Sequence, residues 1–97
     1  MKIFYSYCGD GEGLEYARKG KQLCKQMEIE AWIWEVDGSS AEWLKSDITN
    51  NVDLSDAMIT IVTQGTETSE PQKQEWSLAD SLGKINCSLR KKGLNNL

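Results

Sequence analysis

The sequence predicts an α/β domain, a doubly wound parallel sheet with the element order βαβαβαβ. Two observations predict this fold. Short apolar or aromatic runs alternate strictly with segments of helical periodicity, and polar, glycine-bearing turns separate them. The third run, AMITIV at 57–62, is apolar on both alternating faces, as in a strand covered on both sides. Right-handed crossovers then give the strand order 2-1-3-4.

Local patterns place the individual elements. Strands are predicted at 2–7, 29–34, 57–62 and 85–89. Helices are predicted from 14, from about 40, and from 71 to about 82. Ser39 and Glu42 have the spacing of a capping box, Pro71 suits a helix start, and Gly83 suits a helix end. One side of the first helix is expected to hold Leu14, Ala17, Cys24 and Met27.

Composition limits the possible classes of function. The 97 residues predict a single domain, 1–97, with 91–97 as a solvated tail. The net charge of −4 disfavours a nucleic-acid groove, and no stretch approaches the ~20 apolar residues of a membrane span. Three widely spaced cysteines fit reduced thiols and a cytoplasmic location. The sequence has no histidine, so histidine catalysis and most zinc sites are excluded and no metal is expected.

Three loops are expected to meet at one edge of the sheet, because parallel strands end at the same edge. These loops are 8–13, 35–40 and 63–70. Ligands of doubly wound folds bind at this edge, where the strand order reverses between the first and third strands. Any binding site is therefore predicted there.

One carboxylate, Glu75, is the leading candidate for a functional group at that edge. It shares a helical stripe with Leu78, Ala79 and Leu82, so it faces inward from the first turn of the third helix. A buried carboxylate is costly unless it has a partner or faces a ligand. Two interpretations remain open. In the first, structural interpretation, Glu75 caps its own helix or pairs with Lys73 or a loop amide. In the second, functional interpretation, it meets a sugar hydroxyl or a developing oxocarbenium ion of a substrate.

Other chemically notable side chains favour structural roles. The four tryptophans, Trp32, Trp34, Trp43 and Trp76, are expected mainly in the core, although Trp34 or Trp43 can border the site. Cys8 has no basic neighbour to activate it, so a plain buried thiol is expected rather than a nucleophile. The glycines at 9, 11 and 13 do not have the spacing of a dinucleotide fingerprint.

A succession of loose motifs resembles a Toll/interleukin-1 receptor (TIR) domain of the bacterial type. The matching segments, in the family's order, are FYSY at 4–7, residues 32–43, SDAMITIV at 55–62 and SEPQKQEW at 69–76. Ala79, Gly83 and Lys84 continue the last motif, and the match covers about residues 2–86.

This resemblance implies a flavodoxin-like fold and one of two functions. Many such domains cleave NAD⁺ at the nicotinamide–ribose bond, as hydrolases or cyclases in signalling or defence, whereas others are non-catalytic protein–protein interaction modules. In the enzymes the glutamate that maps onto Glu75 is catalytic, and NAD⁺ is the substrate. The residues implied to contact it are Ser6, Tyr7, Cys8, Gly9, Trp34 and Asp37.

A second family of this fold, the nucleoside 2-deoxyribosyltransferases, also resembles part of the sequence. Its nucleophilic glutamate precedes a helix reading E-x-G-x-A-x-x-x-G-K, and Glu75, Ala79, Gly83 and Lys84 match this pattern. Ser77 replaces the first glycine, and the family's D-x-G-T element is missing. This family is the alternative enzyme.

The sequence departs from the TIR pattern in two ways. Pro71 stands where the family has a tryptophan, so stacking on a ligand must come from another ring. The usual last strand-and-helix portion is also missing, which leaves the first helix alone on its face of the sheet. Apolar parts of the third strand then stay uncovered, and such surfaces commonly mark interfaces. We therefore predict self-association or pairing with other TIR-like domains.

Overall fold

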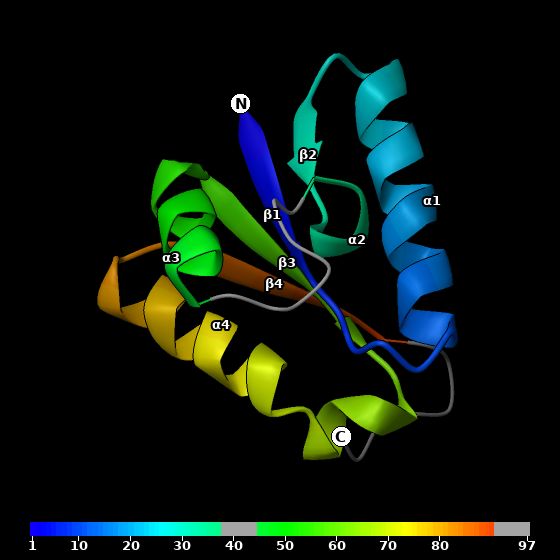
Figure 1. The fold of residues 1–97 in the computed structure, drawn as a ribbon. Helices are drawn as coiled ribbons and strands as arrows, with labels where there is room; N and C mark the ends of the chain where they lie inside the picture. The colour runs from blue at the N-terminus through cyan, green and yellow to red at the C-terminus, as the bar shows by residue number, and fades with distance from the viewer. Residues whose placement is uncertain (38–44, 91–97) are drawn as a thin grey trace.

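The computed structural model describes the backbone of residues 1–37 and 45–90 (Figure 1). In chain order its elements are β1 (Lys2–Ser6), α1 (Glu12–Gln26), β2 (Glu30–Trp32), α2 (Trp34–Asp37), α3 (Lys45–Leu54), β3 (Ala57–Val62), the 3₁₀ helix η1 (Gln64–Thr68), α4 (Glu70–Ser81) and β4 (Ile85–Arg90). None of the helices in these two ranges has the length and apolar character needed to cross a membrane.

The sheet confirms the predicted fold class and topology. Its four strands are all parallel and lie in the order β2-β1-β3-β4. The central strands β1 and β3 pair from Ile3 with Ala57 to Ser6 with Thr60, so their carboxyl ends reach the same edge of the sheet. The fold is thus the flavodoxin-like α/β sheet that was expected.

Alternation along β1 sends its side chains into two separate cores. Tyr5 belongs to the core under α1, and Phe4 belongs to the core under α3 and α4. Figure 1 shows α1 on one face of the sheet and α3 and α4 on the other. Phe4 stacks on Trp32, with 4.8 Å between ring centroids, so the prediction that a tryptophan anchors the core is confirmed. Trp34 and Trp76 are half-buried beside this core, and Trp43 lies outside the described residues.

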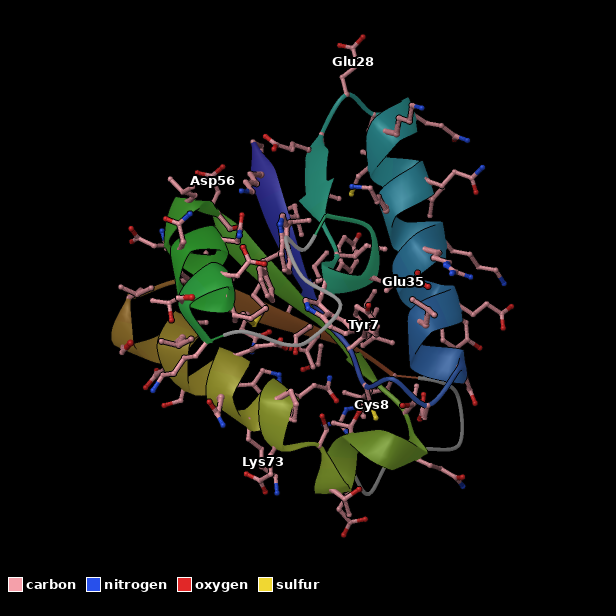
Figure 2. All side chains as sticks on the ribbon, in the orientation of Figure 1. Tyr7, Cys8, Glu28, Glu35, Asp56 and Lys73 are labelled. Atoms are coloured by element: carbon pink, nitrogen blue, oxygen red, sulfur yellow. The ribbon has the colours of Figure 1, made fainter. Side chains whose placement is uncertain are left out.

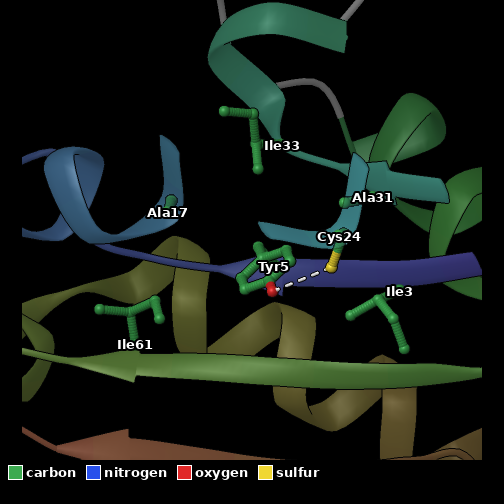
Figure 3. Close-up of a cluster of buried hydrophobic side chains, with 7 residues drawn as sticks. All are labelled: Ile3, Tyr5, Ala17, Cys24, Ala31, Ile33 and Ile61. Carbon is green, nitrogen blue, oxygen red and sulfur yellow. Dashed lines mark hydrogen bonds between the residues drawn. The ribbon is translucent and has the colours of Figure 1, made fainter. Parts of the chain in front are cut away.

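The core under α1 includes a polar contact between Tyr5 and Cys24 (Figure 3). The phenol oxygen and the Cys24 sulfur share a hydrogen bond of 3.4 Å, and burial raises the pKa of Tyr5. A Cβ at Gly20 would lie 2.6 Å from the Tyr5 ring, so a glycine is needed where α1 crosses this side chain. Cys24 therefore packs into this core, on the side of the first helix where the sequence predicted it.

The predicted boundaries of two strands were wrong. β1 ends at Ser6, before Tyr7, and β2 covers only Glu30 to Trp32. The local sequence continues the apolar run through Trp34, but β2 is an edge strand that pairs with β1 for three residues only. The chain then leaves the sheet, and Trp34 begins the short helix α2 instead of ending a strand.

Helix ends account for the other differences. Met27 and Leu82 were predicted on buried stripes, but they are the C-caps of α1 and α4 and are 68% and 40% exposed. The segment predicted as a loop after β3 contains η1, which Thr63 and Thr66 cap reciprocally. The predicted opening of the second helix near Ser40 lies outside the described residues, as does the predicted tail 91–97.

The face of the sheet that carries α1 is incompletely covered. On β4, the exposed side chains of this face are Ile85, Cys87 and Leu89. Because side chains alternate along a strand, these three lie on the same face as the β3 residues with which they pair. A hollow of about 440 Å³ runs between α1 and this part of the sheet, with Leu23 and Leu89 among its lining residues.

Self-association through this face remains a prediction. We expect Leu89→Lys to weaken it by about tenfold or more, because a charge replaces a side chain of the interface. Sedimentation velocity over a concentration series measures this effect. Leu54→Lys, at a leucine of similar exposure at the end of α3 (60%, against 54% for Leu89), is the matched control and should leave association unchanged. A wild-type chain that sediments strictly as a monomer at high concentration would exclude the interface.

Candidate active site

Helix α4 carries the central carboxylate of the site inward. Ser69 is its N-cap and accepts a hydrogen bond of 3.3 Å from the backbone N–H of Gln72, and Pro71 is the second helical residue. The buried residues of the helix are Gln72, Glu75 and Ala79, at positions i, i+3 and i+7. Glu75 is only 4% exposed, so the helix presents it to the sheet near its own N-terminus.

Glu75 is held by the last residue of β1. The hydroxyl of Ser6, which is fully buried, donates a hydrogen bond of 2.7 Å to Oε1 of Glu75. Ser69, not Glu75, is the N-cap of the helix, and Lys73 forms an ion pair with Glu70 on the exposed side. The interpretation of Glu75 as a helix cap was therefore wrong.

Glu75 borders a cavity of about 220 Å³ at the carboxyl edge of the sheet. The cavity is lined by Tyr5, Tyr7, Gly9, Trp34, Ser69, Pro71 and Glu75. The loop after β1, the start of α2 and the start of α4 thus converge on one small space. Larger hollows lie beside α1 and α3, but Glu75 borders none of them.

The structure brings together four of the seven predicted site residues at this cavity: Tyr7, Gly9, Trp34 and Glu75. Ser6 is buried and is not part of the lining, but its hydroxyl bonds to Glu75. Cys8 is not part of the lining, and Asp37 ends α2 with its side chain outside the described part of the chain. The sequence did not predict three lining residues: Tyr5, Ser69 and Pro71. Ser69 and Pro71 stand at a predicted helix start next to the strand ends, and this position could have identified them.

Tyr7 presents a protonated phenol at this site. Burial raises its pKa, and the nearby carboxylates of Glu35 and Glu75 raise it further. Its oxygen accepts a hydrogen bond of 3.1 Å from the backbone N–H of Glu35, whose carboxylate forms a two-bonded ion pair with Arg18. Figure 2 shows Tyr7 and Cys8 where β1 leaves the sheet, well away from Glu28 and Asp56.

Cys8 is a half-buried thiol rather than an activated nucleophile. Burial raises its pKa, and the neighbouring carboxylate of Asp10 adds to the effect. A thiol with a raised pKa holds its proton at neutral pH and is a poor nucleophile. The sequence predicted a plain buried thiol, whereas Cys8 is only half-buried.

Asp10 joins the loop after β1 to the loop after β3. Its Oδ1 accepts a hydrogen bond of 2.8 Å from the backbone N–H of Gly13, and its Oδ2 accepts one from Thr63 Oγ1 (2.6 Å) and one from the backbone N–H of Gly65 (3.1 Å). Partial desolvation opposes ionisation, but these three bonds outweigh it and lower the pKa of Asp10. A Cβ at Gly65 would lie 2.6 Å from the Cys8 sulfur, so the two loops pack closely at this point.

The electrostatic character of the cavity follows from its lining. Glu75 is the only charged side chain among the described lining residues, and no lysine or arginine is among them. Among residues 1–37 and 45–90, no three potential metal-ligating side chains gather in a cluster. The described wall therefore offers aromatic surface, hydroxyls and one carboxylate.

Comparisons with known proteins identify a similar fold. No family model and no curated protein matches the sequence. Among solved structures, this chain is similar to a 2-deoxyribosyltransferase from the psychrotolerant bacterium Bacillus psychrosaccharolyticus, which is described as a biocatalyst for the synthesis of nucleosides. The TM-score is 0.69 and the sequence identity 19%, over 96% of this chain and 74% of that chain. The likeness concerns the fold, and none of these comparisons supports the TIR resemblance.

Proposed function

We propose that this domain breaks the N-glycosidic bond of a nucleoside and transfers the sugar, in the manner of a nucleoside 2-deoxyribosyltransferase. The observation that carries the proposal is the buried carboxylate of Glu75, bonded to Ser6 at 2.7 Å and bordering a small cavity with aromatic walls. The fold shared with a 2-deoxyribosyltransferase supports it. So does the partial match of Glu75, Ala79, Gly83 and Lys84 to that family's motif.

The proposed reaction has two steps. A carboxylate oxygen of Glu75 attacks C1′ of the sugar, and the bond between C1′ and the base nitrogen breaks. The bonding electrons leave with the base, which takes up a proton from solvent, and the sugar becomes an ester of Glu75. A nitrogen of a second base then attacks C1′ and loses its proton, and the ester bond breaks to restore the carboxylate. With water as the acceptor the same sequence is a hydrolysis.

The size and charge of the cavity favour a nucleoside over a complete dinucleotide. Pockets for drug-sized ligands commonly measure roughly 300–1,000 Å³, and the cavity at Glu75 measures about 220 Å³. Its described lining offers no cation for a pyrophosphate. Trp34 and Tyr7 supply aromatic surface for a base, in place of the ring that the TIR pattern has at Pro71.

Cleavage of NAD⁺ is the second candidate function, because it breaks the same kind of bond and also uses a carboxylate. The TIR-like order of motifs favours it, with NAD⁺ as substrate and residues near Glu75 as the nicotinamide site. The third candidate is a protein–protein interaction module that catalyses no reaction. Each of the three makes a different prediction about turnover.

Base exchange separates the candidates. The 97-residue protein is incubated with a 2′-deoxynucleoside and a different free base, and the new nucleoside is followed by chromatography. A parallel incubation with NAD⁺ follows nicotinamide release. Exchange supports the transferase, and nicotinamide release without exchange supports the NAD⁺ enzyme. Absence of turnover in both incubations at high protein concentration contradicts both enzymes and leaves the interaction module.

A further inference from the structure

The side-chain amide of Gln72 is completely buried between α4 and the sheet. Its Nε2 donates to two backbone carbonyls, that of Ser6 at 3.3 Å and that of Ile61 at 3.1 Å. Gln72 is 0% exposed, and it is not among the residues that line the cavity at Glu75. Gln72 therefore holds its place through contacts within the protein, and not through a ligand in the cavity.

Gln72 joins the two central strands at the edge where the site forms. Ser6 is the last residue of β1 and pairs with Thr60, the residue before Ile61 in β3. One amide group thus fixes the carboxyl ends of both strands to the first turn of α4. This is the point where the chain leaves the sheet toward the loops that line the cavity.

Ser6 is held by α4 at two atoms. Its backbone carbonyl accepts a hydrogen bond from Gln72, and its hydroxyl donates one to Glu75. Gln72 and Glu75 are i and i+3 on the buried face of the same helix. The helix, the end of β1 and the two side chains therefore form a closed ring of contacts, with the carboxylate of Glu75 in it.

The amide occupies this place at a cost. Its Oε1 is buried and has no hydrogen-bond partner among the described residues. Burial of an unpaired acceptor destabilises the folded state, and an apolar side chain of similar size would avoid this penalty. The two bonds of Nε2 are the visible compensation, and both of them act on the strand ends beside the site.

We propose that Gln72 is a positioning residue for the Glu75 carboxylate. It fixes the backbone of Ser6 so that the Ser6 hydroxyl meets Oε1 of Glu75, and the carboxylate then keeps one orientation toward the cavity. The catalytic consequence rests on the proposed function. The geometric consequence, the Ser6–Glu75 hydrogen bond, does not depend on it.

Gln72→Met tests the catalytic consequence, with Gln74→Met as the matched control. Methionine keeps the volume of glutamine but removes both donors, and Gln74 is an exposed residue of the same helix. We expect kcat for base exchange to fall by about tenfold in Gln72→Met, with KM changed by less than about twofold, because the nucleophile is misplaced and the cavity wall is intact. Gln74→Met should keep both constants. A folded Gln72→Met protein with the wild-type kcat overturns the proposal.

Gln72→Glu covers the case in which the methionine variant does not fold. A carboxylate at this place faces two carbonyl oxygens without a donor, whereas the protonated acid regains one donor. We expect kcat below the wild-type value at neutral pH, with the ratio to wild type rising as the pH falls. A ratio that stays at one at neutral pH overturns the proposal.

Crystal structures of Gln72→Met and Gln74→Met separate the failure of this inference from the failure of the proposed function. We expect the distance between Ser6 Oγ and Glu75 Oε1 to exceed hydrogen-bonding range in the first variant and to stay at the wild-type value in the second. If the wild-type protein has no turnover, the proposed function fails and this distance alone decides the role of Gln72. A wild-type distance in Gln72→Met overturns it.

Discussion

Glu75→Gln is expected to lower the rate of N-glycosidic cleavage by roughly 10³-fold or more. Glutamine keeps the size of the side chain and an oxygen that can accept the hydrogen bond from Ser6, so the fold should survive. It removes the negative charge, and a neutral amide is a very poor nucleophile toward C1′. Initial rates of base exchange and of NAD⁺ cleavage measure the effect on both candidate reactions.

Glu70→Gln is the control for this substitution. Glu70 lies in the first turn of the same helix, but it is exposed and pairs with Lys73. Its substitution removes the same charge from the same helix end without touching the cavity, so the rate should stay near the wild-type rate. An active protein whose Glu75→Gln variant keeps the full rate would exclude Glu75 as the catalytic residue.

Asp10→Asn is expected to lower the free energy of unfolding by about 2 kcal/mol. The carboxylate accepts three hydrogen bonds that join the loops after β1 and β3. In asparagine one of the two oxygens becomes an NH₂ group, which would face the backbone N–H of Gly13 or of Gly65 instead of accepting a hydrogen bond from it. The loss is no larger because Asp10 is exposed, so water replaces part of each lost bond. Urea unfolding measures this free energy. Asp80→Asn, at an exposed residue near the end of α4, is the control and should leave the free energy of unfolding at the wild-type value.

The loss of unfolding free energy in Asp10→Asn should also depend on pH. The folded-state pKa of Asp10 lies below its ordinary value, so the ionised carboxylate stabilises the folded state above the unfolded pKa of about 3.9. This stability is lost as the pH falls through the lower, folded-state pKa. The difference between wild type and Asp10→Asn should therefore be constant from neutral pH to about pH 5 and narrow below about pH 4. A difference that grows toward acid pH would contradict the lowered pKa.

The fold could be predicted because its main signals are local. The run at 57–62 is apolar on both faces, and such a strand must lie inside a sheet covered on two sides. The short crossovers then leave few possible strand orders. The end of β2 could not be predicted in this way, because its apolar run continues to Trp34 while its pairing with β1 ends at Trp32. Partners distant in sequence decide where an edge strand stops.

The site could be predicted only in part, for a related reason. Glu75 was identifiable as a carboxylate on an otherwise apolar helical stripe. Gln72 and Asp10 have the same polar appearance as surface residues of a helix or loop, and nothing in their neighbours indicates otherwise. Their roles depend in part on distant groups that only the folded chain brings near: the hydroxyl of Thr63 and the amide of Gly65 for Asp10, and the carbonyl of Ser6 for Gln72.

The most direct test of Glu75 as the nucleophile is detection of the sugar ester. The protein is mixed with a 2′-deoxynucleoside, quenched in acid and digested, and its peptides are analysed by mass spectrometry. We predict a peptide that contains Glu75 and carries one added deoxyribosyl group, present in wild type and in Glu70→Gln and missing in Glu75→Gln. Turnover of the nucleoside with the deoxyribosyl group on another residue, or the same adduct level in Glu75→Gln, would contradict the proposed role of Glu75.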